Sequence, residues 1–170
     1  SYGFYPAGGG ELTGEIDGAG TPCPFEQTDR GEKISRSLQA IVANLPADIA
    51  KRELSTASKL IELEDEDAMT ILAPDSIGPG NVLYGRLVYE KSTTLFSPFG
   101  EKGVSAEQVG KRLAKQMKAF TASSAAVDHH LADQLLLPMA LAKGGVFSTL
   151  RPSLHATTNA ETVSKFTGRR

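Results

Sequence analysis

The chain has 170 residues, of which 40% are hydrophobic and 22% are charged, and its formal net charge is −2. This composition is typical of a globular protein with one or two compact domains, and it excludes a disordered or fibrous chain. A near-neutral charge is not typical of nucleic-acid-binding proteins, so binding to nucleic acid would require a local basic patch.

Two further features indicate the cellular setting. The single cysteine, Cys23, has no partner for an internal disulfide bond, and the N-terminus lacks the apolar stretch of a secretion signal. Together they favour a reducing, cytoplasmic compartment. The longest apolar stretch, Leu135–Ala142, contains Pro138 and is much shorter than the about 20 residues that span a bilayer. We therefore predict a core helix there and no membrane partner.

The start of the chain predicts strands. The pattern of Phe4–Ile16 predicts the end of one strand, a glycine turn at Gly8–Gly10 and a second strand. Strands need partners and this segment starts abruptly, so we expect the complete protein to have residues before Ser1. A loop rich in Gly, Pro and Thr follows at Asp17–Thr28 and predicts a domain boundary.

The middle of the chain predicts a small α/β unit. Apolar and small residues at Ile34–Val42 predict a strand, and the apolar spacing that starts after Leu45–Asp48 predicts a helix. Met69–Leu72 predicts a short strand. Val82–Tyr89 and Thr94–Ser97 then predict a hairpin.

The next helix starts at a capping box, in which Ser105 and Gln108 satisfy each other's backbone amides. The apolar face of this helix carries Val109, Leu113, Met117 and Phe120. Its opposite face carries Lys111, Arg112, Lys115 and Lys118. These cations either face solvent, which is the simpler interpretation, or bind phosphate groups.

The last part of the chain predicts two helices separated by a strand. Ser124–Ala142 is predicted as a helix with a kink near Pro138, and Val146–Leu150 as a strand. The final helix is predicted to start at a cap on Thr158 or Asn159.

The domain organisation follows from the order of these elements. The β-α-β-β-α order of the middle segment predicts an inserted small α/β domain at residues 32–120. Residues 1–31 and 121–170 are then parts of a main domain that carries the active site. The predicted fold class is α/β, more closely α+β.

His155 is the first candidate for catalysis. It is predicted to follow a strand and to stand just before Thr157–Asn159, a helix-start signal, so its side chain is expected beside exposed helix amides that bind phosphate readily. Neutral imidazole is a competent nucleophile near pH 7, and its attack on a phosphate gives a covalent phosphoramidate. By spacing alone, a histidine that merely hydrogen-bonds in a loop is the simpler interpretation.

A second candidate group lies at residues 130–134. On a helix His130, Asp133 and Gln134 share one face, whereas Leu131 and Leu135 are expected to face the core. A ring that stacks, a carboxylate and an amide suit a nucleobase and its ribose. An ordinary polar helix face is the alternative.

No metal-binding or hydrolase motif accompanies these residues. The sequence contains neither a cysteine pair nor an H-E-x-x-H motif, and His129 and His130 point to different sides of a helix. A G-x-S-x-G motif is also absent. We therefore assign no metal ligand in this chain.

The chain resembles the RNA 3'-terminal phosphate cyclases in segments that follow the family's order from one end to the other. These segments are Gly3–Gly10, Gly78–Asn81, Gly100–Glu107, Leu131–Ala142 and Ser153–Asn159. The resemblance implies repeated units of a four-stranded sheet with two helices, together with an inserted small α/β domain. It covers only the C-terminal half of the family's enzymes, so the missing N-terminal half of the same enzyme, whether joined or as a second chain, is an expected partner.

The resemblance also implies an ATP-dependent reaction. His155 would attack the α-phosphate of ATP and carry AMP, which passes to an RNA 3'-terminal phosphate, and the neighbouring 2'-hydroxyl would then close a 2',3'-cyclic phosphate. A divalent cation, Mg²⁺ or Mn²⁺, would accompany the triphosphate. The residues expected to bind ATP are His130, Leu131, Ala132, Asp133 and Gln134. His130 departs from the family's pattern, because the bacterial enzymes usually have tyrosine at that position.

Three alternatives compete with this interpretation. A non-catalytic, cyclase-like ribosome-biogenesis protein would lack the nucleophilic histidine, whereas His155 is present. An enolpyruvate transferase shares a similar repeated architecture but does not explain the segment Leu131–Ala142. A generic binding domain does not explain why the segments occur in order.

Overall fold

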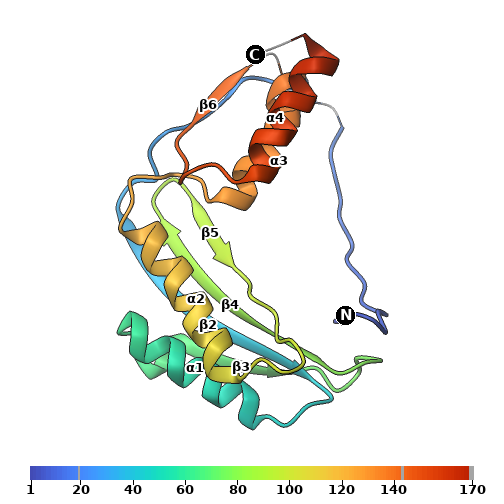
Figure 1. Cartoon of the computed structure of the whole chain (residues 1–170), viewed down its shortest axis with the longest axis vertical. Coiled ribbons are helices and arrows are strands. Elements are labelled where there is room, and N and C mark those ends of the chain that lie inside the picture. Colours follow the sequence, from blue (N-terminus) through green and yellow to red (C-terminus); the bar gives the residue numbers. More distant parts are fainter. Residues whose placement is uncertain (19, 143, 169–170) are drawn as a thin grey trace. The chain divides into compact units, whose positions relative to one another are not determined.

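The computed structural model describes residues 1–18, 20–142 and 144–168, and within them it has four α-helices and two sheets (Figure 1). This mixed architecture confirms the predicted α+β class. The elements are β1 (Phe25–Gln27), β2 (Lys33–Ala43), α1 (Asp48–Ile61), the 3-10 helix η1 (Asp65–Asp67), β3 (Ala68–Leu72), β4 (Gly80–Tyr89), β5 (Thr93–Phe96), α2 (Ala106–Thr121), α3 (His129–Leu141), β6 (Gly145–Phe147) and α4 (Leu154–Thr167).

The chain divides into two compact units. Unit 1 consists of Ser1–Glu15, Lys33–Val88 and Leu95–Ala119. Unit 2 consists of Ile16–Glu32, Tyr89–Thr94 and Phe120–Arg170. The assignment of residues 32–120 to an inserted domain, and of residues 1–31 and 121–170 to a main domain, stays a prediction.

The larger sheet has the strand order β3-β2-β4-β5. Strands β2 and β3 are parallel, with the register running from Leu38 opposite Ala68 to Val42 opposite Leu72. Parallel neighbours need a crossover, and α1 supplies it. The predicted β-α-β start of the middle segment is therefore confirmed.

Helices α1 and α2 cover one face of this sheet (Figure 1). Leu83 and Leu87 of β4 are buried, as alternate residues on one face of a strand should be. Between them Gly85 allows close packing, because a Cβ at this position would lie 2.4 Å from Met117 Sδ of α2. Gly110 does the same between the helices, since a Cβ there would lie 2.7 Å from the Glu53 carbonyl oxygen of α1.

The other face of the sheet is covered at one end by Phe4, which belongs to a buried cluster with Ile41 and Val82. The strands predicted at Phe4–Ile16 are wrong. This segment forms only an isolated antiparallel bridge, in which the Gly8 amide donates to the Phe4 carbonyl at 2.8 Å. A strand requires a continuous neighbouring ladder, and within the described residues none lies beside this segment.

Unit 2 contains a small parallel sheet of β1 and β6, paired from Phe25 opposite Gly145 to Gln27 opposite Phe147. Strand β1 lies inside the loop predicted at residues 17–28. It was not predicted because three residues are too few to show the alternation of apolar and polar residues that marks a strand. The strand predicted at Val146–Leu150 starts one residue earlier and ends at Phe147.

Arg30 closes the C-terminal end of α2 within unit 2. Its guanidinium donates to four carbonyl oxygens, those of Phe120, Thr121, Ser123 and Ala125, at 2.7 to 3.1 Å. The same group lies 4.6 Å from the centre of the Tyr89 ring and 4.8 Å from that of Phe120. One side chain therefore donates to several carbonyls at and just beyond the end of the helix, and it also stacks on two aromatic rings.

No helix in the described ranges is both long and apolar enough to cross a bilayer.

Candidate functional site

The first part of the candidate site is the N-terminal turn of α3. Asp128 caps this helix, because its Oδ1 accepts from the amides of His130 at 2.7 Å and Leu131 at 3.2 Å. The helix predicted from Ser124 therefore starts at His129 instead. The cap decides the boundary, since an extended residue that satisfies two helix amides cannot itself continue a helix.

The second part of the candidate site is the N-terminal turn of α4. Ser153 caps this helix by accepting from the Ala156 amide at 3.1 Å. The caps predicted on Thr158 or Asn159 are wrong, because both residues lie inside the helix. His155 is consequently the second residue of α4 and is exposed, at the end where helix amides lack intrahelical acceptors.

The two N-terminal turns lie at the same end of unit 2. Val127, just before α3, forms a parallel bridge with Thr149, a few residues before α4. The Ala126 amide donates to the Ser148 carbonyl at 3.1 Å, which strengthens this pairing. From there α3 and α4 run side by side in the same direction (Figure 1). The positive ends of two helix dipoles thus favour an anion at one place.

A side-chain contact joins the helices one turn farther along. The Asn159 Nδ2 donates to both the Asp133 carbonyl and the Asp133 Oδ1, each at 3.0 Å. His155 and Asn159 are four residues apart on α4 and therefore share a face. The structure thus brings Asp133 of α3 to the face of α4 that carries His155.

The other residues predicted to bind nucleotide occupy different environments. His130 and Gln134 are exposed, and Asp133 is half-buried. Leu131, which we expected to face the core, is 40% exposed, whereas its neighbour Ala132 is buried. Helices α3 and α4 pack on each other, and the small Ala132 is the buried residue of α3.

His129 and His130 form a local pair, with ring centroids 4.0 Å apart and ring planes tilted by 37°. Burial lowers the pKa of His129, and the neighbouring His130 lowers it further, while Asp128 acts in the opposite direction. The neutral form of His129 is therefore favoured near neutral pH. Of the two rings, that of His130 is the more exposed.

The described residues do not form a metal site of their own. No three of their His, Cys, Asp or Glu side chains gather closely enough to hold an ion. Asp128 and Asp133 are engaged with helix amides and with Asn159, respectively. A divalent cation would therefore need ligands from outside the part of the chain that the structure describes.

Two features of the candidate site were not predicted from the sequence. Asp128 precedes a helix as a cap should, and this signal was available in the sequence. The contact of Asn159 with Asp133 carries no local signal, because the residues are 26 positions apart and meet only through helix packing.

Comparison with known proteins gives a consistent match. The family model described as RNA 3'-terminal phosphate cyclase matches residues 1–170. A protein of that name from Koribacter versatilis is 45% identical over 97% of this chain, and one from Ralstonia nicotianae is 42% identical over 97%. The protein of the same name from Ectopseudomonas mendocina is 39% identical, again over 97% of the chain.

The match covers only part of these relatives. The aligned region is 46% of the Koribacter protein, 47% of the Ralstonia protein and 48% of the Ectopseudomonas protein. The chain thus spans about half the length of the curated relatives it matches.

Proposed function

Because the chain belongs to the RNA 3'-terminal phosphate cyclase family, we propose that it supplies the nucleophile and part of the nucleotide site of an enzyme that cyclises RNA 3'-terminal phosphates with ATP. The observation that carries this proposal is the pairing of α3 and α4 with their N-termini at the same end, where His155 begins α4 and Asp133 bonds to Asn159 one turn along. This chain corresponds to the C-terminal half of such an enzyme, and the remaining half is its partner.

The first step is nucleotidyl transfer to His155. A ring nitrogen of the imidazole attacks the α-phosphorus of ATP, pyrophosphate leaves, and AMP stays on the ring as a phosphoramidate. The amides and dipoles of the two helix N-termini stabilise the negative charge on the phosphate oxygens.

The second and third steps use the bound AMP. An oxygen of the RNA 3'-phosphate attacks the phosphorus of the AMP and displaces the His155 nitrogen. The adjacent 2'-hydroxyl then attacks the former 3'-phosphate and expels AMP, which leaves the 2',3'-cyclic phosphate. Covalent catalysis thus divides one difficult condensation into easier displacements.

The nucleotide is held by α3. His130 is exposed and suited to stack on the adenine, while Asp133 and Gln134 suit the ribose hydroxyls. Leu131 and Ala132 lie on α3 between His130 and Asp133, and Ala132 is buried.

Further components of the reaction remain outside this chain. A divalent cation, Mg²⁺ or Mn²⁺, would enter with the triphosphate and neutralise its charge. Its ligands would come from the remaining half, from ATP or from water. We also propose a cytoplasmic location, because the single Cys23 suits a reducing compartment.

The test is covalent labelling of the complete enzyme. Incubation with ATP labelled at the α-phosphate and with Mg²⁺ or Mn²⁺ should leave AMP on the protein, and His155→Asn should abolish the label. The bond should be labile in acid and stable in alkali, as expected for a phosphoramidate. His129→Asn is the matched control and should still be labelled. A label that survives His155→Asn would remove His155 from the reaction.

The alternative is a non-catalytic relative that acts in ribosome biogenesis. The same experiment separates the two, because a non-catalytic protein takes up no label even with ATP and metal in excess. The presence of His155 in an exposed helix N-terminus favours the enzyme.

A further inference from the structure

Unit 1 contains a cleft of about 890 Å³ whose lining includes three separated segments. These are Gly3–Pro6, Pro79–Asn81 and the segment from Gly100 to Ala106. Each belongs to one of the sequence motifs through which the chain resembles the cyclase family, yet none carries a residue of the proposed reaction. The size lies within the range of small-molecule sites.

Glycines allow these segments to approach one another. A Cβ on Gly80 would lie 2.2 Å from the Phe4 ring, and a Cβ on Gly100 would lie 1.9 Å from Asn81 Oδ1. Any larger residue at either position would force the walls apart. The cleft therefore depends on these glycines.

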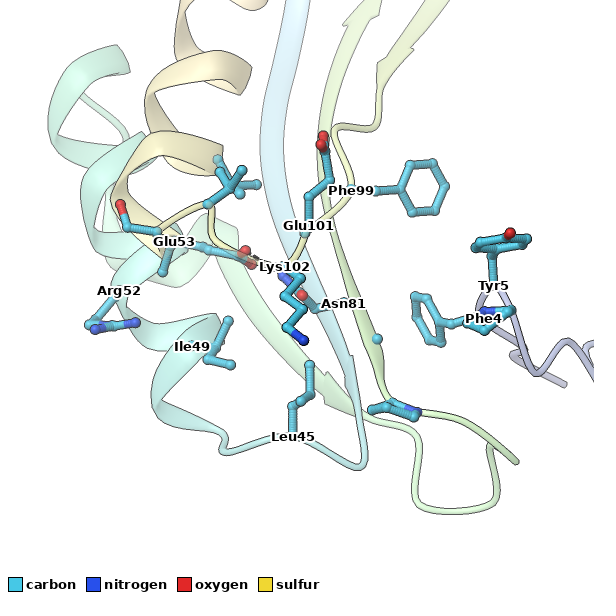
Figure 2. Close-up of a pocket in the computed structure, with 18 of the residues that line it drawn as sticks. Phe4, Tyr5, Leu45, Ile49, Arg52, Glu53, Asn81, Phe99, Glu101 and Lys102 are labelled. Carbon is cyan, nitrogen blue, oxygen red and sulfur yellow. Dashed lines mark hydrogen bonds between the residues drawn. The ribbon is translucent and has the colours of Figure 1, made fainter.

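A buried carboxyl group lies in the wall of the cleft. Glu53 of α1 is fully buried, and its Oε1 accepts a hydrogen bond from the Asn81 Nδ2 (Figure 2). Its Oε2 is also buried and has no hydrogen-bond partner among the described residues. A buried oxygen without a donor is costly, so an N–H or O–H group that reached it from the cleft would remove that cost.

The protonation of Glu53 reflects the same environment. Burial raises the pKa of this carboxyl to about 7, against the opposing effects of the Asn81 hydrogen bond and the Arg52 charge. A ligand donor on Oε2 would stabilise the charged form. The charged carboxylate form of Glu53 is therefore unfavourable only while no donor reaches Oε2.

The remaining walls divide the cleft into two parts. Beside Glu53, the side chains of Leu45 and Ile49 point toward Lys102 (Figure 2). Phe99 points away from them, toward Phe4 and Tyr5 (Figure 2). Tyr5 is 96% exposed and Phe99 is 55% exposed, so two aromatic rings stand open at this side of the cleft.

We propose that this cleft binds bases of single-stranded RNA. One base lies between the aliphatic wall and Lys102, with an amino or imino N–H donating to Glu53 Oε2. A neighbouring base stacks on Phe99 and Tyr5, and the Lys102 ammonium meets the intervening phosphate. This inference rests on the proposed function, because the cyclase reaction supplies the RNA.

The arrangement favours a strand over a free nucleotide. Single-stranded RNA presents unstacked bases that stack on aromatic side chains and use their edges for hydrogen bonds. A single nucleotide would occupy only one of the two parts. A strand of two or more nucleotides would occupy both.

The test is an NMR titration of the 170-residue chain with a five-nucleotide RNA that ends in a 3'-phosphate. The side-chain amide of Asn81 is the direct reporter, because it is bonded to Glu53. Its resonances should shift on titration. AMP should bind at least about ten-fold more weakly than the RNA, because it lacks the second base, and ribose 5-phosphate, which has no base, should leave Asn81 unchanged.

Variants separate the contributions. Glu53→Gln keeps the shape but places an NH₂ group where the acceptor was, so RNA affinity should fall by about ten-fold or more. Glu66→Gln removes an exposed carboxylate that does not line the cleft and should change the affinity by less than about three-fold. Phe99→Leu, at an exposed position, should weaken binding about ten-fold through lost stacking.

The inference is overturned if millimolar RNA leaves the Asn81 amide unshifted, or if ribose 5-phosphate shifts it as RNA does. It is also overturned if AMP binds as tightly as RNA, or if Glu53→Gln and Phe99→Leu both bind like the parent chain. Should Glu53→Gln not fold, Phe99→Leu decides alone. Labelling of His155 by ATP needs no RNA, so its loss would count against the proposed function and not against this cleft.

Discussion

The charged side chains of this fold differ in how completely their polar atoms are hydrogen-bonded. Arg30 is surrounded by carbonyl oxygens and aromatic rings, whereas Glu53 is buried with one oxygen lacking a donor. Asp133 lies between these extremes, half-buried and bonded to Asn159. The energetic consequences of each can be measured separately.

The first prediction concerns the pH dependence of stability. Burial raises the pKa of Glu53 from 4.5 to about 7, so the folded state holds a proton that the unfolded state has released. The associated stability is fully present below pH about 4.5 and is lost as the pH rises through about 7, by up to about 3 kcal/mol. Urea unfolding of the parent chain and of Glu53→Gln between pH 4 and 8 should show this slope only in the parent. Equal slopes would mean that Glu53 titrates normally.

The second prediction concerns the contact between α3 and α4. In the complete enzyme, Asn159→Ala should raise the ATP concentration needed for half-maximal AMP labelling by about 5- to 100-fold, because Asp133 loses its donor. His130→Ala and Gln134→Ala should weaken ATP binding in the same assay.

An exchange of the two side chains distinguishes positioning from simple packing. The double variant Asp133→Asn with Asn159→Asp restores a hydrogen bond between the helices, so thermal stability should recover. ATP affinity should stay low, because the carboxylate is now on the wrong helix. Full recovery of ATP affinity would show that Asp133 serves only the helix contact.

At the scale of elements, helix ends were predictable where the cap was local. The capping box of Ser105 and Gln108 forms as predicted, with reciprocal bonds of 3.1 and 3.2 Å. The starts of α3 and α4 were predicted wrongly, because other polar residues near each boundary offered competing caps. Strand β1 was missed since its pairing with β6 depends on residues far along the chain.

The third prediction concerns the end of α2. Arg30→Lys should destabilise the chain by about 2 kcal/mol or more, because an ammonium has three donors and cannot reproduce the planar fork that reaches four carbonyls. Thermal or urea unfolding measures the loss. Lys118→Ala, at an exposed position of the same helix, is the control and should change stability by less than about 0.5 kcal/mol. A cost for Arg30→Lys no larger than that of the control would contradict this role.

At the scale of the whole molecule, the chain leaves large apolar side chains uncovered in unit 2. Leu154 is 85% exposed and Phe166 is 87% exposed. Further exposed apolar residues of this unit are Leu131, Leu137, Leu141 and Val146. Since the chain spans about half of its relatives, we expect the remaining half to pack on these side chains.

The fourth prediction follows from this expected packing of a second half. The isolated chain, mixed with ATP, Mg²⁺ and a 3'-phosphorylated RNA, should not form the cyclic phosphate. Under the proposed function this chain supplies the nucleophile, and we expect the remaining half to supply other charged groups that stabilise the transition state; such preorganised charges usually provide the largest part of the rate. Adding the remaining half as a separate chain should restore cyclisation, but not when the chain carries His155→Asn. Robust cyclisation by the isolated chain would refute this prediction.

Local sequence patterns were sufficient to assign the family, the fold class and those elements whose signals lie in neighbouring residues. Periodicity places apolar residues on one face of α1 and α2, and the capping box starts α2, because these patterns depend only on near neighbours. The tertiary structure decided which distant residues meet. It brought Asp133 to Asn159, placed Glu53 beside Asn81, and surrounded Arg30 with the end of α2. Such contacts depend on how helices and sheets pack, and the spacing of residues along a chain does not record that packing.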